Sequence, residues 1–146
     1  MTRRQRLAAG LTALAAAAVG AFAILARNAE SFFEQSVGIE HLDAIGFERR
    51  SIDGPDGRRI RYFASGDAAK GRVVYVHGTP GDANNWSAYV KDPVDGMQSI
   101  SYDRPGFGHT EPAAAMPALA DQARALGVFL DGDGPPAILV GHSLGG

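Results

Sequence analysis

The sequence predicts an α/β domain with a mostly parallel sheet and flanking helices, preceded by an N-terminal hydrophobic helix. Three observations lead to this prediction. A turn-rich pair of short runs typical of a β-hairpin begins near residue 47. Apolar, β-branched runs then alternate with stretches of helical periodicity. Each of the last three expected strands leads directly into a glycine-containing motif. A hairpin followed by strand, helix, strand, helix and strand is the order expected of an α/β domain.

The first element, residues 1–27, is predicted to be a signal anchor or a signal peptide. Leu7 to Ala26 contain no charged residue, and as a helix they would be about 30 Å long, the thickness of a bilayer core. Arginines at positions 3, 4 and 6 precede this stretch. The positive-inside rule therefore keeps the N-terminus in the cytoplasm and directs the rest of the chain across the membrane.

Two interpretations of this segment remain open. Its length favours an uncleaved anchor, whereas Ala21-Phe22-Ala23 fits the small-x-small pattern that precedes a cleavage site. A buried soluble helix is a third, weaker alternative, because the apolar character is not confined to one face. Both main interpretations predict membrane contact through residues 7–26 and a protein that is membrane-anchored or exported, on the periplasmic or other extracytoplasmic face.

The charge balance and the absence of cysteine exclude several classes of function. Arg27 and the three arginines before the apolar stretch account for 4 of the 14 basic residues. Residues 28–146 therefore contain 10 basic residues and all 16 acidic residues, a net charge of −6. We therefore expect no nucleic-acid partner. The absence of cysteine excludes disulfides, cysteine nucleophiles and cysteine-ligated zinc. No histidine or carboxylate cluster has metal-ligand spacing, so no metal is expected.

Residues 28–46 are predicted to be a linker or short helix, and the α/β domain is predicted to span residues 47–146. Its hairpin consists of two runs, Phe47 to Ile52 and Arg59 to Ser65, joined by a segment rich in Asp, Gly and Pro. The next strand, Arg72 to Val76, is almost continuously β-branched and aromatic, as expected of a strand covered on both faces.

Two helices and two further strands complete the predicted order. The helices are expected at Ala83 to Lys91 and at Met116 to Leu130, where leucine and alanine recur at helical spacing. The strands are expected at Met97 to Tyr102 and Ala137 to Val140.

A distinctive motif follows each of the three later strands, at the strand ends where ligand sites gather in open α/β sheets. The motifs are His77-Gly78-Thr79-Pro80-Gly81, Asp103-Arg104-Pro105-Gly106-Phe107-Gly108 and Gly141-His142-Ser143-Leu144-Gly145.

The third motif has the G-x-S-x-G pattern of a nucleophile elbow. A serine at the tip of so tight a strand-to-helix turn adopts a strained backbone conformation, and its flanking residues must pass close together. Gly141 and Gly145 lack the Cβ atoms that would collide. A phosphate-binding turn is the alternative, but the sequence lacks both the Lys-Ser/Thr ending of a P-loop and the full dinucleotide-binding spacing.

In this order, the three motifs resemble those of the serine-nucleophile α/β-hydrolase family, whose pattern is H-G-x-P, then D-x-P-G-x-G, then G-H-S-x-G-G. The resemblance covers about residues 47–146, the N-terminal half of such a domain. It implies that Ser143 attacks an ester, amide or similar carbonyl compound and forms an acyl-enzyme. It also implies that the oxyanion hole consists of the backbone N–H groups of Thr79 and Leu144. The substrate is then a small molecule and no cofactor is needed.

The remaining motif residues are expected to shape the turns and loops around the nucleophile. They are His77, Gly78, Pro80, Gly81, Gly141, His142, Gly145 and Asp103. His77 and His142 flank glycines inside turns, so we expect neither to be the general base. Arg104 and its neighbour Asp103 are expected to be structural as well.

The base and the acid of a catalytic triad are not visible in this sequence. The family order is Ser, then Asp or Glu, then His, and three residues follow Ser143 here. We therefore expect a fragment of a longer hydrolase or a truncated reading frame, inactive as a 146-residue chain. A serine at the elbow argues against the haloalkane dehalogenase and epoxide hydrolase branches, which use an Asp nucleophile. The alternative function is a noncatalytic, membrane-tethered binding domain with the same fold.

Overall fold

The computed structural model describes residues 38–111, 118–131 and 135–146. Two compact units divide the chain, and the second, Ile39–Gly146, contains every helix and strand discussed below. The predicted hydrophobic segment, Leu7 to Ala26, lies outside the described residues. Within the described ranges, no helix is both long enough and apolar enough to cross a membrane.

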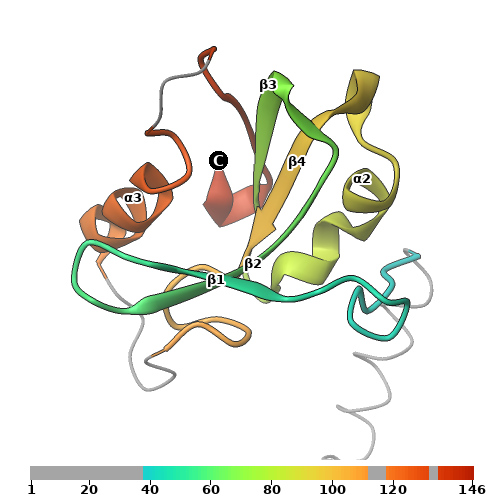
Figure 1. The fold of residues 1–146 in the computed structure, drawn as a ribbon. Coiled ribbons are helices and arrows are strands. Elements are labelled where there is room, and N and C mark those ends of the chain that lie inside the picture. The colour runs from blue at the N-terminus through green and yellow to red at the C-terminus, as the bar shows by residue number, and fades with distance from the viewer. Residues whose placement is uncertain (1–37, 112–117, 132–134) are drawn as a thin grey trace, which may run out of the picture. The chain divides into compact units, whose positions relative to one another are not determined.

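A five-stranded mixed sheet forms the centre of the second unit, with its strands in the order β1-β2-β4-β3-β5 (Figure 1). The strands are β1 (Arg50–Asp53), β2 (Arg59–Ser65), β3 (Asp67–Val76), β4 (Met97–Tyr102) and β5 (Ile138–Gly141). β3 is parallel to both β4 and β5, whereas the β1–β2 hairpin adds to β4 through antiparallel pairing. The sheet is therefore more mixed than predicted, because the hairpin joins it directly.

Strand β3 begins at Asp67 rather than at the predicted Arg72. Its pairing with β4 is irregular between these two residues, so the early part of the strand continues through a bulge that apolar periodicity does not reveal. From Val73 to Val76 the strand is buried on both faces. This explains why its sequence is a continuous apolar run.

The helices lie on opposite sides of the sheet (Figure 1). One side carries η1 (Ala83–Trp86) and α2 (Ser87–Lys91), where a single helix was predicted. Asp82 caps η1 in a capping box with Asn85. The other side carries α3 (Leu119–Gly127), which is shorter than predicted. The two faces bury separate apolar clusters: Leu42, Phe63, Ala83 and Val90 on the α2 side, and Ile60, Ala64, Val74, Val76, Ile100, Tyr102, Ala125 and Phe129 on the α3 side.

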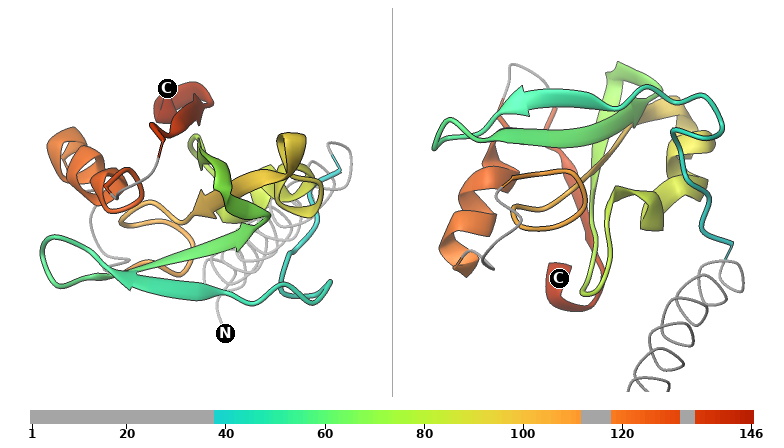
Figure 2. Two further views of the ribbon diagram at one scale, coloured as in Figure 1. Left: turned by 45° about the horizontal axis from the view of Figure 1, so that its top comes forward. Right: turned by 90° about the horizontal axis from the view of Figure 1, so that it is seen from below.

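The three parallel strands end at one edge of the sheet. Val76 at the end of β3 pairs with Gly141 at the end of β5, and Tyr75 pairs with Ser101 near the end of β4. The three motifs therefore leave the sheet side by side, and the C-terminal η3 (Ser143–Gly145) lies next to the loop that follows β3 (Figure 2). This edge is the position expected for a ligand site.

Candidate active site

Ser143 occupies the tip of a sharp turn between β5 and η3. Its φ is 55°, in the left-handed backbone region that residues other than glycine rarely adopt, whereas the backbone of His142 before it is extended. The His142 N–H donates to the Val76 carbonyl (3.1 Å), which holds the turn against the end of β3. The Ser143 side chain is exposed. A strained serine displayed above the strand ends is the geometry of a nucleophile elbow.

Two glycines make this turn possible, each through a different close approach. A Cβ on Gly141 would lie 2.5 Å from the Gly145 carbonyl oxygen. A Cβ on Gly145 would lie 2.5 Å from the carbonyl oxygens of both His77 and Val76. Gly141 therefore lets the elbow fold back on itself, and Gly145 lets it press against the end of β3. Only the first of these contacts follows from the motif alone.

The loop after β3 lies directly against the elbow. A Cβ on Gly78 would be 2.9 Å from the Cβ of Ser143 and 3.0 Å from the His142 carbonyl oxygen. Thr79, whose peptide bond to Pro80 is cis, follows immediately. Within the described ranges, neither the Thr79 nor the Leu144 backbone N–H donates a hydrogen bond to another residue. Two backbone donors beside the serine are thus free to bind an oxyanion.

His77 is fully buried and both of its ring nitrogens have partners. Nε2 accepts from the Arg104 backbone N–H (3.2 Å), so Nδ1 must carry the ring proton and donate it to the Gly78 carbonyl oxygen (2.8 Å). Burial is the main cause that lowers the pKa of His77 to about 4; the nearby Arg104 guanidinium acts in the same direction, and the hydrogen bond to Gly78 opposes it. The ring also packs edge-on against Phe107. These bonds hold the loop in place and leave neither nitrogen for a substrate proton.

The turn after β4 is organised around the buried carboxylate of Asp103. It accepts hydrogen bonds from the Ala83 N–H (2.8 Å), the His109 N–H (2.8 Å) and the Arg49 guanidinium (2.9 Å). Burial raises the pKa of Asp103, and these donors oppose the increase. Gly108, with φ 52°, has no room for a Cβ against this carboxylate. Asp103 therefore connects β4 with η1, its own turn and the segment before β1.

Thr110 and Arg104 have roles that the sequence alone does not reveal. Thr110 is buried, and its hydroxyl accepts from the Arg61 N–H (2.8 Å), which fixes the turn to β2. Arg104 is also buried, and its Nη2 donates to the Gly78 carbonyl oxygen and to the Thr79 hydroxyl, both at 3.0 Å. A threonine two residues after G-x-G and an arginine next to the turn aspartate are the only sequence signals for these contacts.

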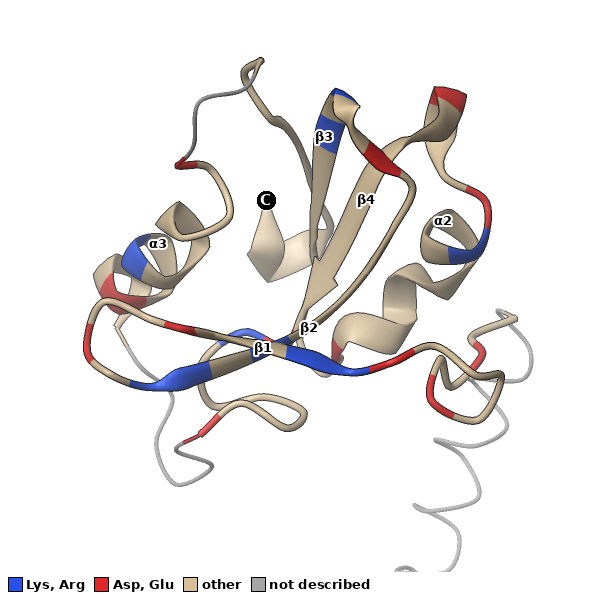
Figure 3. Cartoon of the chain, viewed as in Figure 1, with Lys and Arg blue, Asp and Glu red and all other residues tan. Residues whose placement is uncertain are grey.

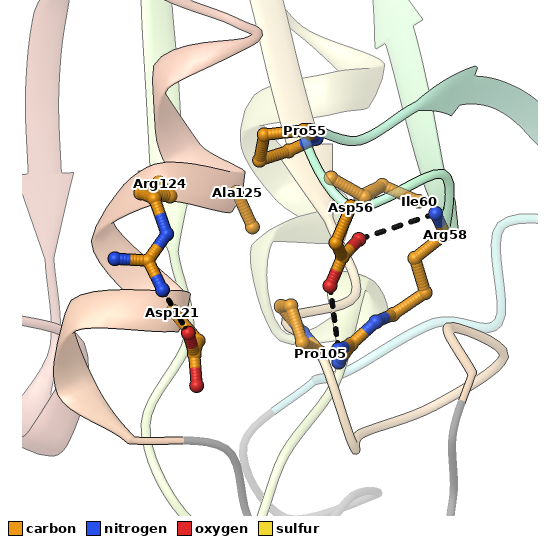
Figure 4. A pocket seen from close by; sticks show the side chains of 8 residues that line it. All are labelled: Pro55, Asp56, Arg58, Ile60, Pro105, Asp121, Arg124 and Ala125. Carbon is orange, nitrogen blue, oxygen red and sulfur yellow. Dashed lines mark hydrogen bonds and ion pairs between the residues drawn. The ribbon is translucent and has the colours of Figure 1, made fainter.

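A cavity of about 110 Å³ lies away from the elbow, between the β1–β2 turn and α3 (Figure 4). Its carboxylates are already paired: Asp56 with Arg58 at 2.5 Å, and Asp121 with Arg124. Of the three strand-end motifs, only Pro105 contributes to its lining. It therefore contains none of the groups that acyl-transfer chemistry needs.

The elbow region has no charged side chain of its own. Residues 135–146 contain no Asp, Glu, Lys or Arg, and this part of the ribbon is uniformly tan (Figure 3). Within residues 135–146, negative charge on a ligand would therefore be stabilised by backbone N–H groups and not by a charged side chain. Across the described ranges, no group of three or more His, Asp or Glu residues could hold a metal ion.

Comparison with known proteins identifies relatives of this region. A sequence profile of the Alpha/beta hydrolase family matches residues 73–146. The dihydrolipoyllysine-residue acetyltransferase component of the acetoin cleaving system of Cupriavidus necator is 37% identical over 92 residues. The match covers 62% of this chain and 24% of that protein, so this chain spans about a quarter of the length of that curated relative.

Solved structures share the fold across different enzymes. Epoxide hydrolase A from Mycobacterium thermoresistibile superposes with a TM-score of 0.60 at 26% identity, over 68% of this chain and 32% of that one. A bacterial membrane phospholipase A gives a TM-score of 0.59 at 23% identity, over 97% of this chain and 44% of that one. One fold thus supports distinct reactions, so the reaction must be argued from the residues of the site.

Proposed function

Because the chain belongs to the Alpha/beta hydrolase family, we propose that it supplies the nucleophile and the oxyanion hole of a serine hydrolase acting on an ester, amide or similar carbonyl compound. The observation that carries this proposal is the left-handed backbone of Ser143 (φ 55°) between glycines, directly against Gly78. A serine, where related branches use an aspartate nucleophile, supports an acyl-enzyme route rather than epoxide or haloalkane hydrolysis.

In the proposed reaction, the Ser143 hydroxyl oxygen bonds to the substrate carbonyl carbon while a base removes the hydroxyl proton. The carbonyl oxygen becomes an oxyanion that accepts hydrogen bonds from the N–H groups of Thr79 and Leu144. Collapse of this intermediate breaks the bond to the alcohol or amine, which leaves with the proton from the base. Water then releases the acyl group from Ser143 by the same steps.

The base and its orienting acid are proposed to come from residues beyond these 146. Both ring nitrogens of His77 already have hydrogen-bond partners. No hydrogen bond joins the His142 ring to the Ser143 hydroxyl within the described ranges. His109 contacts a carboxylate at 3.6 Å, but this carboxylate belongs to Asp103 of the same turn. Serine without a paired histidine is a poor nucleophile, so we expect the 146-residue chain alone to be inactive.

Steady-state hydrolysis of nitrophenyl esters tests the proposal in the protein as its gene encodes it. Ser143→Ala should abolish turnover, whereas Ser51→Ala on β1 should leave kcat unchanged and serves as the matched control. Turnover that survives Ser143→Ala would assign the chemistry to another residue. A purified, monomeric 146-residue chain that hydrolyses these esters at an enzyme-like rate would overturn the assignment of the base to residues beyond it.

A second candidate is acyl transfer to an acceptor other than water, because the relative from Cupriavidus necator is named as an acetyltransferase component. Both reactions use the same acyl-enzyme and differ in what attacks it. Adding a dithiol during ester turnover distinguishes them: a transferase forms thioester product at the expense of free acid. Absence of any acyl-enzyme would instead favour the noncatalytic binding domain.

We also propose, from the sequence alone, that residues 7–26 attach the protein to a membrane and place residues 47–146 on the extracytoplasmic side. Protease accessibility in intact cells tests this placement, since a cytoplasmic domain would remain protected. Persistence of the protein in carbonate-washed membranes would distinguish an anchor from a cleaved signal peptide.

A further inference from the structure

The peptide unit between Gly78 and Thr79 has its two ends in different environments. Its N–H, on Thr79, has no hydrogen-bond partner among the described residues, whereas its carbonyl, on Gly78, accepts two hydrogen bonds. The Arg104 guanidinium donates one from Nη2 (3.0 Å), and His77 Nδ1 donates the other (2.8 Å). A peptide unit is planar and normally trans, so its C=O and N–H point in opposite directions. Fixing the carbonyl therefore fixes the direction of the N–H.

Arg104 is held in place for this contact from several directions. Its backbone N–H donates to His77 Nε2, and its guanidinium carbon lies 4.4 Å from the centre of the Phe107 ring. Nη2 also donates to the Thr79 hydroxyl, so one nitrogen contacts both residues of the peptide unit. The side chain thus ties the turn after β4 to the loop after β3.

The charge of this arginine has no acidic partner among the described residues. No described carboxylate forms an ion pair with Arg104, although its side chain is buried and its Nε has no hydrogen-bond partner. Burial of an unpaired cation is costly. The groups that face the positive charge are the Gly78 carbonyl, the Thr79 hydroxyl and the Phe107 ring. A charged donor on a carbonyl polarises the peptide and makes its N–H a stronger donor.

We propose that Arg104 is the positioning residue of the oxyanion hole: it orients and polarises the Gly78–Thr79 peptide so that the Thr79 N–H meets the developing oxyanion. This inference rests on the proposed function of Ser143. Arg104 acts through the peptide and does not touch the substrate. Its effect belongs to the transition state, where the negative charge develops, and should lower kcat more than it changes KM.

The test compares three Arg104 variants with a matched control in the protein as its gene encodes it. Arg72 is the control because its guanidinium also donates to a backbone carbonyl (Phe129, 2.8 Å) and also has a buried, unpartnered Nε. Arg104→Met should lower kcat roughly ten- to a hundredfold, less than the 10²- to 10³-fold loss when a donor is deleted outright. KM should change by less than about twofold. Arg72→Met should leave kcat unchanged even where it lowers the thermal midpoint.

Conservative variants separate positioning from folding. Arg104→Lys keeps the charge with a single donor group and should give an intermediate kcat. Arg104→Gln keeps a hydrogen-bond donor without the charge, so its kcat should be lower than that of Arg104→Lys. If Arg104→Met does not fold, the Lys and Gln variants decide the question, and wild-type kcat in both folded variants would overturn the proposal.

An infrared measurement reports the hydrogen bond itself. The carbonyl band of a ¹³C-labelled acyl group on Ser143 should move to higher wavenumber in Arg104→Met, because the Thr79 N–H no longer binds the acyl oxygen fully. Wild-type kcat and an unshifted band in folded Arg104 variants would overturn the proposal while leaving Ser143 as nucleophile. Absence of acylation in the wild-type protein would instead refute the proposed function itself.

Discussion

Gly145→Ala should prevent the elbow from closing against the end of β3. The new Cβ would lie 2.5 Å from the carbonyl oxygens of both His77 and Val76. Ordinary van der Waals contact begins at 3.4 Å, so the distance from the Cβ to each oxygen would be 0.9 Å too small. The atoms that would have to move are backbone atoms of the last residue of β3 and of the buried residue that follows it, with no flexible side chain to give way.

The magnitude follows from the cost of inserting a methyl group where none fits. Overpacking a well-packed site costs about 1–3 kcal/mol, and contact with two backbone oxygens places this variant near the upper end. The φ of Gly145 is not in the left-handed region, so the cost is steric and not conformational. We expect the free energy of unfolding to fall by about 2–3 kcal/mol, or the elbow to detach from β3.

Gly127 in α3 provides the matched control, because a Cβ there meets nothing within 4 Å. Gly127→Ala should stabilise the protein by about 0.5–1 kcal/mol through helix propensity. Urea unfolding of both variants measures the two shifts, and the rate of fluorophosphonate labelling at Ser143 reports the elbow. A Gly145→Ala protein with unchanged unfolding and labelling would refute the close packing of the elbow on β3.

Three further predictions concern the residues that hold the site. The pKa of His77 is about 4 in the folded protein and about 6.5 in the unfolded chain. Between these pH values the unfolded state binds more protons than the folded state. The free energy of unfolding should therefore fall by up to about 3 kcal/mol as the pH drops from 6.5 to 4. Urea midpoints at pH 7 and pH 5 check this, and His77→Gln should flatten the slope; the raised pKa of Asp103 acts with the opposite sign. Asp103→Asn should cost about 3 kcal/mol of stability because it removes a buried charge that accepts several hydrogen bonds. Asp43→Asn, which alters the exposed partner of the same Arg49, should cost less than about 1 kcal/mol. Equal losses for the two variants in thermal unfolding would contradict this ranking. Thr110→Val should cost about 1–3 kcal/mol because it leaves the partly buried Arg61 N–H unpaired. Thr110→Ser should restore most of this stability, and identical unfolding midpoints for the two variants would argue against the hydrogen bond.

Local sequence patterns predicted the features that depend on local chemistry. The G-x-S-x-G motif after an apolar strand predicts a strained serine, and Ser143 has φ 55°. The limits of β4 were also predicted correctly, at Met97 and Tyr102. Both depend on residues that are adjacent in the chain, and the types of these residues determine their steric and burial requirements.

Features that depend on contacts between distant segments were not predictable in this way. Arg104 contacts Gly78 across 26 positions, and nothing in its own turn indicates which carbonyl it binds. The antiparallel addition of β2 to β4 depends on how the hairpin packs, which strand periodicity does not specify. The bulge at the start of β3 places a strand where the apolar pattern has not yet begun.

The most direct measurement is to map the fluorophosphonate adduct by mass spectrometry in the protein as its gene encodes it. The account predicts a single adduct on the peptide that contains Ser143, lost in Ser143→Ala and unaffected in Ser51→Ala. A folded protein that remains unmodified, or that carries the adduct on another serine with Ser143 intact, would contradict the assignment of Ser143 as an activated nucleophile.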